Sequence, residues 1–156
     1  MRVALIQPPD ALAAALAARG HDVHRIVGAP RLAHALFRRR AYEPGLADVP
    51  AVAWHLRRGA FDVAHAFAPA HAWAAVALTG VPCVVSLRDT PSHRWLVAHR
   101  YRLPMLLRAS AGAAAVTVAT PEAVDPCRRY LLRAPLVEDW RDAGTLEEIY
   151  RGAVAG

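Results

Sequence analysis

Residues 61–89 constrain the fold more than any other part of the chain, because they read as strand, helix, turn and strand in succession. Residues 62–67 and 82–87 are short and mostly apolar, as parallel strands covered on both faces should be. Residues 71–78 have a helical pattern, and Gly80 and Pro82 supply a turn. The stretch therefore predicts a βαβ unit with a right-handed crossover.

The same alternation continues on both sides of this unit. Further strands are expected at residues 3–7, 21–27, 113–118 and 134–137. Further helices are expected at residues 11–19, 30–40, 52–58, 95–110, 120–132 and 145–151, with Asp10 and Thr120 as N-caps and a kink or break at Pro104. The predicted fold class is α/β, a single Rossmann-like doubly wound parallel sheet of five or six strands with helices on both faces.

Composition limits the function in a few respects. The net charge is +6, which favours anionic partners, but all 19 basic residues are arginine and lysine is absent, so codon bias explains part of this charge. Two cysteines provide neither a disulfide framework nor a zinc spacing, and we expect a reducing, cytoplasmic location. The N-terminus is broken by Pro8 and Pro9 too early for a signal peptide, and the longest apolar tract, residues 64–87, is interrupted by proline and glycine.

Familiar catalytic signatures are missing from the sequence. It contains no Gly-x-Ser-x-Gly, no P-loop and no Gly-x-Gly-x-x-Gly, which argues against a serine hydrolase, a Walker NTPase and a standard dinucleotide enzyme. The eight histidines are scattered, and His65/His71 and His93/His99 lack a helical i, i+4 spacing. We therefore expect no metal and no bound cofactor.

Polar residues gather where the two central strands end. His65 lies near the end of the first, while Ser86, Arg88 and Asp89 end the second. In open α/β sheets the carboxyl edge is where ligands bind, so these residues are candidates for a site. Arg88 could hold an anionic group and Asp89 could orient a hydroxyl, although an Arg–Asp structural pair explains the same residues. For His65 the alternative is a partly buried histidine bonded to a neighbouring loop.

Five ordered segments carry a resemblance to a known family. They are MRVALI (1–6), LAARGHDVH (16–24), LRRGAFDVAHA (56–66), LTGVPCVVSLRD (78–89) and AAVTVATPEAV (114–124). Together they resemble the N-terminal, acceptor-side half of GT-B glycosyltransferases, especially glycosyltransferase family 4. The resemblance implies a Rossmann-like domain over residues 1–137. It also implies that residues 138–156 form a C-terminal helix that packs back on this domain.

The chain departs from that family in three places. A second Rossmann-like domain, which binds the nucleotide-sugar donor in the family, has no counterpart in these 156 residues. The loop after the first strand has Pro8 and Pro9 where the family commonly has glycines, and this removes backbone donors for a phosphate. Phe67 replaces the second histidine of a family motif whose first histidine is matched by His65.

The strand ends and the resemblance together indicate a set of site residues. His65 and Asp89 are the predicted catalytic residues, and the predicted substrate-binding residues are Ser86, Arg88, His71 and His93. His71 could stand in for the histidine that Phe67 replaces, and His93 lies on the loop after Asp89. A nucleotide sugar would be the donor substrate rather than a cofactor.

Two main functions follow, and a third, a truncated product with no task of its own, stays open. The first is the acceptor-side half of a sugar-transferring enzyme that needs a separate donor-binding partner. The second is a catalytically inactive glycosyltransferase-like module that binds or regulates another protein, with self-association as an alternative. No nucleic acid partner is expected. Arg38, Arg39 and Arg40 end an expected helix that could rest on anionic lipid at the inner face of the membrane, although an ordinary surface helix explains them too.

Overall fold

The structure is a computed structural model that describes residues 1–26, 45–87, 103–118, 122, 124–130, 136–138 and 142–156. The strands are β1 (Arg2–Ile6), β2 (Asp22–Ile26), β3 (Val63–Ala66), β4 (Cys83–Leu87), β5 (Ala115–Val118) and β6 (Leu136–Glu138). The helices are α1 (Asp10–Ala18), the 3-10 turn η1 (Leu46–Asp48), α3 (Val49–Arg58), α4 (Pro69–Leu78), α6 (Leu103–Gly112), α7 (Val124–Tyr130) and α8 (Ala143–Ala155).

The strands form one parallel sheet in the order β2-β1-β3-β4-β5-β6. Each neighbouring pair is parallel, with registers such as Val3 beside Val63 and Ser86 beside Thr117. The predicted α/β class with a parallel sheet is therefore confirmed, with six strands in the part of the chain that the structure describes.

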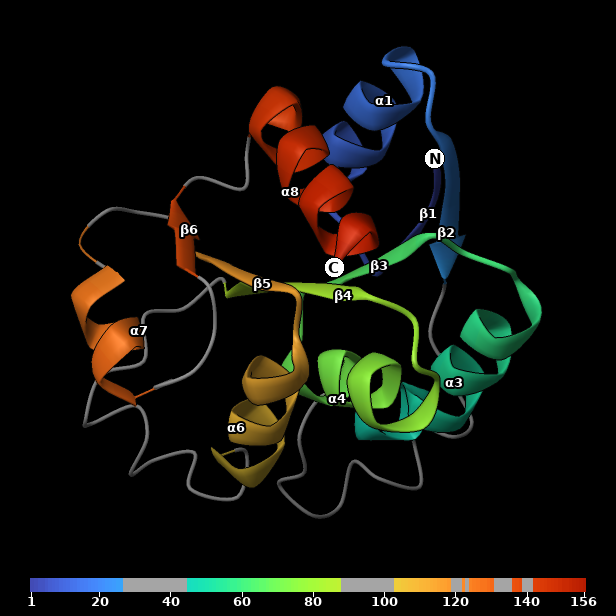
Figure 1. The fold of residues 1–156 in the computed structure, drawn as a ribbon. Helices are drawn as coiled ribbons and strands as arrows, with labels where there is room; N and C mark the ends of the chain where they lie inside the picture. The colour runs from blue at the N-terminus through green and yellow to red at the C-terminus, as the bar shows by residue number, and fades with distance from the viewer. Residues whose placement is uncertain (27–44, 88–102, 119–121, 123, 131–135, 139–141) are drawn as a thin grey trace.

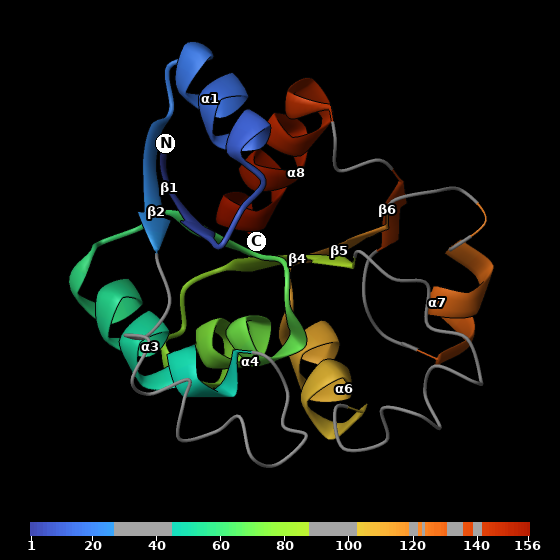
Figure 2. The same ribbon diagram turned by 180° about the vertical axis from the view of Figure 1, so that it is seen from behind.

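Helices cover both faces of the sheet (Figures 1 and 2). Helices α1 and α8 lie on one face, where α8 contacts α1, β3 and β4. Helices α3, α4 and α6 lie on the other face, with α4 between its two neighbours. The sheet is therefore doubly wound, because the chain returns from β1 to β2 on one face and from β3 to β4 on the other.

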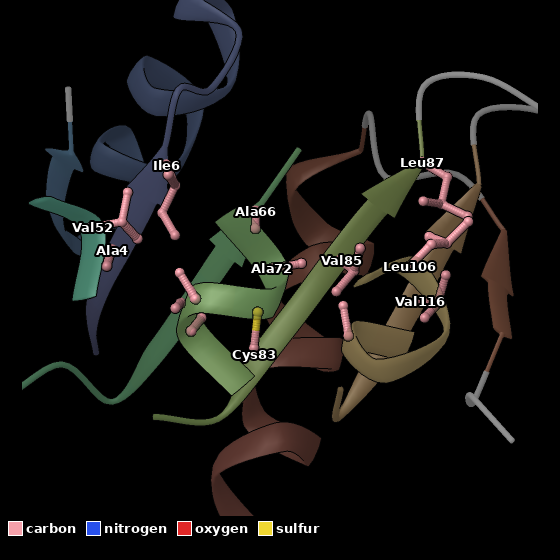
Figure 3. Packing of buried hydrophobic residues seen from close by; sticks show 14 of the residues in the cluster. Ala4, Ile6, Val52, Ala66, Ala72, Cys83, Val85, Leu87, Leu106 and Val116 are labelled. Carbon is pink, nitrogen blue, oxygen red and sulfur yellow. The ribbon is translucent and has the colours of Figure 1, made fainter. Parts of the chain in front are cut away.

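The period-two alternation of the strands divides the core between these faces. In β1, Ala4 and Ile6 belong to the cluster under α3, α4 and α6, while Val3 and Leu5 belong to the cluster under α1 and α8. Figure 3 shows the first cluster, in which side chains from β1, β3, β4 and β5 meet those of the covering helices. Each buried Leu, Ile or Val side chain contributes roughly 1.5–3 kcal/mol, so the two clusters supply the main driving force for folding.

Helix α4 is unusual for its small buried side chains. Its fully buried alanines face the sheet and the neighbouring helices, and they are Ala70, Ala72, Ala74 and Ala75. At its boundary with α6, a Cβ added at Gly112 would lie only 2.3 Å from Cγ1 of Val76. Such contacts hold α4 close to β3, β4 and α6.

Most predicted elements are present with shifted ends. The first helix begins at Asp10 with Pro9 as its N-cap, so the prediction that Asp10 is the cap was wrong; Asp10 instead pairs with Arg25 at 2.6 Å. Pro104 lies in the first turn of α6, where proline is tolerated. Helix α8 is longer than predicted because the Asp142 carboxylate accepts a hydrogen bond from Thr145 N at 2.7 Å and caps it. The expected helix at residues 30–40 lies outside the described residues.

Candidate functional site at the carboxyl edge of the sheet

The carboxyl ends of β1 and β3 form the switch point of this sheet. These strands are neighbours, yet the chain leaves β1 towards α1 on one face and leaves β3 towards α4 on the other (Figure 2). In doubly wound sheets the loops diverge at such a point, and ligands bind beside it. The residues around it are therefore the first place to look for a site.

Three polar side chains meet at the switch point, and we call them the Asp48 cluster. The Asp48 carboxylate accepts a hydrogen bond from the Gln7 amide at 2.9 Å and lies 3.0 Å from Nε2 of His71. Asp48 and His71 are each only 1% exposed. Because they come from the loop after β1, from η1 and from the first turn of α4, the cluster ties together three segments that surround the switch point.

Backbone conformation at two positions permits this cluster. Gln7 leaves β1 with a positive φ of 52°, which is uncommon for a residue with a side chain. Gly45 has φ 103°, and a Cβ built on it would lie 2.7 Å from Nε2 of His71. Glycine is thus required at residue 45 both for the left-handed backbone and for the close approach of the imidazole.

A second buried group, which we call the His65 chain, lies between the sheet and α8. His65 Nδ1 is 2.5 Å from the Tyr150 hydroxyl, and His65 Nε2 is 2.6 Å from Oγ of Ser86. Oγ of Ser86 is in turn 2.6 Å from Oγ1 of Thr117. All four residues are buried, so three hydrogen bonds link α8 to β3, β4 and β5 without access to solvent.

Burial sets the protonation states of the side chains in the His65 chain. Desolvation lowers the pKa of His65 from 6.5 to about 3, so its imidazole is neutral at physiological pH. Desolvation also raises the pKa of the Tyr150 hydroxyl, which keeps the phenol protonated. His65 therefore acts here as a neutral hydrogen-bonding group.

Phe67 also packs on His65. Their ring centroids are 4.3 Å apart with an interplanar angle of 29°, and Phe67 is 7% exposed. The position that carries a histidine in the resembling family is thus occupied by an aromatic ring of the core cluster under α1 and α8. This aromatic contact adds apolar cover to one side of the imidazole.

The structure places the predicted site residues in two groups. It brings His65 and Ser86 into direct contact and puts His71 in the Asp48 cluster. With 0% exposure His65 could touch a substrate only after the surrounding side chains had moved, so its catalytic role stays a prediction. Outside the described residues lie Arg88, Asp89 and His93, together with the proposed lipid-contacting residues Arg38, Arg39 and Arg40.

Sequence reasoning missed Asp48, Gln7, Tyr150 and Thr117. Asp48 precedes a proline-containing helix start and resembles an ordinary helix cap, and Tyr150 resembles one apolar position of an amphipathic helix. A buried histidine in β3 was the one available signal, because both of its ring nitrogens need partners. The sequence gives no indication of which distant residues supply them.

The described ranges contain neither a metal cluster nor a membrane-spanning helix. No group of three or more histidine, cysteine, aspartate or glutamate side chains there could hold a metal ion. In the same part of the chain, no helix has the length and apolar character needed to cross a bilayer.

The fold has a counterpart among solved structures. A chain from Thermosynechococcus elongatus, titled a sucrose-phosphate synthase, matches with a TM-score of 0.64 and 17% sequence identity, over 97% of this chain and 98% of that one. The two chains share a Rossmann-like α/β fold. The sequence itself matches no protein-family model and no curated protein. At such low identity the likeness shows the fold and leaves the activity open.

Proposed function

We propose that this chain is the acceptor-side half of a GT-B-type glycosyltransferase and that it transfers sugar only together with a separate donor-binding partner. The observation that carries the proposal is the near-complete match, over 97% of the chain, to a solved chain titled a sucrose-phosphate synthase. Helix α8 packs beside α1, so both ends of the chain contribute to the one domain that the match covers.

The need for a partner follows from how two-substrate transfer is catalysed. Donor and acceptor must be held in one orientation, and such positioning contributes roughly 7–11 kcal/mol to rate enhancement. In a GT-B enzyme the two substrates lie between two domains, and this chain would supply one of those domains. The isolated chain is thus expected to lack the surface that positions the donor.

The proposed acceptor site lies at the carboxyl edge of the sheet. Arg88 would hold an anionic group of the acceptor, Asp89 would orient the reacting hydroxyl, and His93 would contact the acceptor from the following loop. Ser86 is the penultimate residue of β4, two positions before Arg88, and His71 lies at the start of α4 on the same edge. In this arrangement the Asp48 cluster would hold His71 in place at the start of α4.

The test begins with the isolated chain and a panel of nucleotide sugars. Calorimetric titration should give no measurable binding, and no sugar should be transferred to any acceptor. A partner captured from the native source should carry a donor-binding fold and should restore transfer. In the reconstituted pair, Asp89→Asn should abolish transfer, whereas Asp62→Asn should not, because Asp62 accepts from the backbone N–H of Arg2 at the opposite edge. Transfer by the isolated chain would refute the need for a partner.

A second candidate is a catalytically inactive module that regulates another protein. It is supported by Phe67, whose ring packs in the core instead of presenting a polar group at the edge. It is also supported by Pro8 and Pro9, which remove two backbone donors from the loop after β1. For this function the captured partner would be active alone, and addition of the chain would change its rate without any effect of Asp89→Asn. Self-association would appear as a dimeric native mass.

A further inference from the structure

The three helices that cover one face of the sheet contain no carboxylate, and we call them the α3–α4–α6 layer. Each is ten residues long, and none of them contains aspartate or glutamate. Their permanently charged residues are Arg57 and Arg58 of α3 and Arg108 of α6, while α4 has none. The helices lie side by side with α4 in the middle, so this layer carries charge of one sign only (Figure 1).

The opposite face of the sheet has a different charge pattern. Helix α1 contains Asp10, and α8 contains Glu147 and Glu148. Glu147 forms ion pairs with Arg19, at 2.7 Å, and with Arg151. The arginines of that face are thus neutralised by nearby carboxylates. No described carboxylate forms an ion pair with the arginines of the α3–α4–α6 layer.

Large apolar side chains are exposed on the same layer. Trp54 of α3 is 52% exposed and Leu107 of α6 is 40% exposed. The guanidinium carbon of Arg58 lies 4.7 Å from the centroid of the Trp54 ring, and Arg108 directly follows Leu107 in the chain. Aromatic and aliphatic side chains beside arginines are typical of protein surfaces that lie in the headgroup region of a bilayer.

The helix macrodipole explains only part of this arrangement. Arg57 and Arg58 lie in the last turn of α3, where cations are favoured, and Nε of Arg57 donates to the Leu78 carbonyl at 2.8 Å. However, Arg108 lies in the middle of α6. The dipole also favours carboxylates in the first turn of a helix, and all three helices lack them there. The exposure of Trp54 has no explanation in the dipole either.

We propose that the α3–α4–α6 layer is a docking surface for a bilayer that carries anionic headgroups. Trp54 and Leu107 enter the headgroup region, where their apolar surface leaves water. Arg58 and Arg108 contact lipid phosphates, which attract cations near the membrane surface.

Charge and size favour a bilayer over two other occupants. A second copy of the chain docking through the same layer would bring like charges together. A nucleic acid duplex is held by many phosphate contacts, about 6–10 in a typical complex, whereas this layer has three arginines. A bilayer needs fewer cations, because the exposed apolar side chains contribute to its binding.

The proposal goes beyond the proposed function, because it requires no sugar transfer. It also places the lipid contact elsewhere than at Arg38, Arg39 and Arg40, which lie outside the described residues. The layer covers a face of the sheet, so a bilayer against it would lie alongside the sheet and leave the carboxyl edge open at the side (Figure 1).

The test is co-sedimentation of the full chain with vesicles of an equimolar mixture of phosphatidylcholine and phosphatidylglycerol. Wild type should bind these vesicles, should not bind pure phosphatidylcholine, and should dissociate as salt is added. The double variant Arg58→Gln, Arg108→Gln should bind about 25-fold more weakly, from roughly fivefold for each arginine. The matched control is Arg25→Gln, Arg151→Gln, which removes the same charge from β2 and α8 and should bind within about twofold of wild type.

A tryptophan variant tests the apolar part of the contact. Trp54→Ser should weaken binding by about tenfold, because it removes the largest apolar group of the layer that enters the headgroup region. Brominated lipids should quench the tryptophan fluorescence of vesicle-bound wild type, and Trp54→Phe should lose part of this quenching. Trp54 is exposed, so both replacements should fold, which circular dichroism checks.

Three results would overturn the proposal. One is an absence of binding to the anionic vesicles, and another is equal weakening by the two double variants, which would show that only net charge matters. The third is tighter binding to duplex DNA than to vesicles, or dimerisation that Arg58→Gln, Arg108→Gln abolishes, since the layer would then have another occupant. No readout requires a sugar or a donor-binding partner, so failure of this proposal is distinguishable from failure of the glycosyltransferase role.

Discussion

Acidification should destabilise this protein through His65. Its pKa is about 3 in the folded chain, against 6.5 for an unperturbed histidine, because burial disfavours the charged imidazole. Between these values the unfolded state binds a proton that the folded state excludes. Stability is therefore fully present above about pH 6.5 and is lost progressively as the pH falls towards 3.

The magnitude follows from the two pKa values. Each pH unit in this window lowers the free energy of unfolding by about 1.4 kcal/mol for one such group. Between about pH 7 and pH 4.5 the loss from His65 alone is then about 3 kcal/mol. Since small domains have total stabilities of about 5–15 kcal/mol, this one imidazole should account for a large fraction of the acid sensitivity.

The assay is urea unfolding of wild type and His65→Gln at matched pH values from about 7 down to about 4.5. Glutamine cannot be protonated, and other titrating groups contribute nearly equally to both proteins. The stability advantage of wild type over the variant should therefore shrink by about 3 kcal/mol across the series. His55→Gln, which removes an exposed histidine from α3, controls for loss of an imidazole. An advantage that changes by less than about 0.5 kcal/mol would refute the buried, neutral assignment.

Two further predictions concern the Asp48 cluster, each measured by chemical denaturation. Gly45→Ala should lower the free energy of unfolding by about 2–3 kcal/mol, because the new Cβ would lie 2.7 Å from Nε2 of His71 and the backbone has φ 103°. Gly80→Ala, at φ 72° with open space around it, should lower it by only about 1 kcal/mol. Equal losses would contradict the contact between residue 45 and His71. Asp48→Ala should lower the free energy of unfolding by about 2–4 kcal/mol, because it removes an acceptor of Gln7 and His71. Asp10→Ala breaks an exposed ion pair with Arg25 and should lower it by less than about 1 kcal/mol. The reverse order would disprove the buried role of Asp48.

The sheet could be predicted from local patterns because its strands and helices carry their own signals. Residues 62–67 and 82–87 are apolar and separated by a helical run, and Gly20 and Gly80, both with positive φ, end the elements before them. These features need no information from distant parts of the chain. The right-handed crossover rule then leaves few ways to arrange the strands.

The site could be predicted only in part, because its contacts are long-range. The carboxyl edge, His65 and Ser86 follow from strand ends, and His71 follows from its place early in the next helix. However, one partner of His65 lies 85 positions away on α8. Similarly, Asp48 meets His71 across 23 positions and Gln7 across 41. No periodicity relates such residues, so local reasoning recognises a polar group without identifying what satisfies it.

The alanines of α4 have a consequence for how the molecule could change over time. Because this helix fills its space with methyl groups, a longer side chain at Ala72 or Ala75 could be accommodated only by displacing the helix from the sheet. His71 would travel with it and lose its place against Gly45 and Asp48. The small size of the α4 side chains and the arrangement of the Asp48 cluster are therefore coupled. A substitution that enlarges one of these alanines would also disturb the cluster at the carboxyl edge of the sheet.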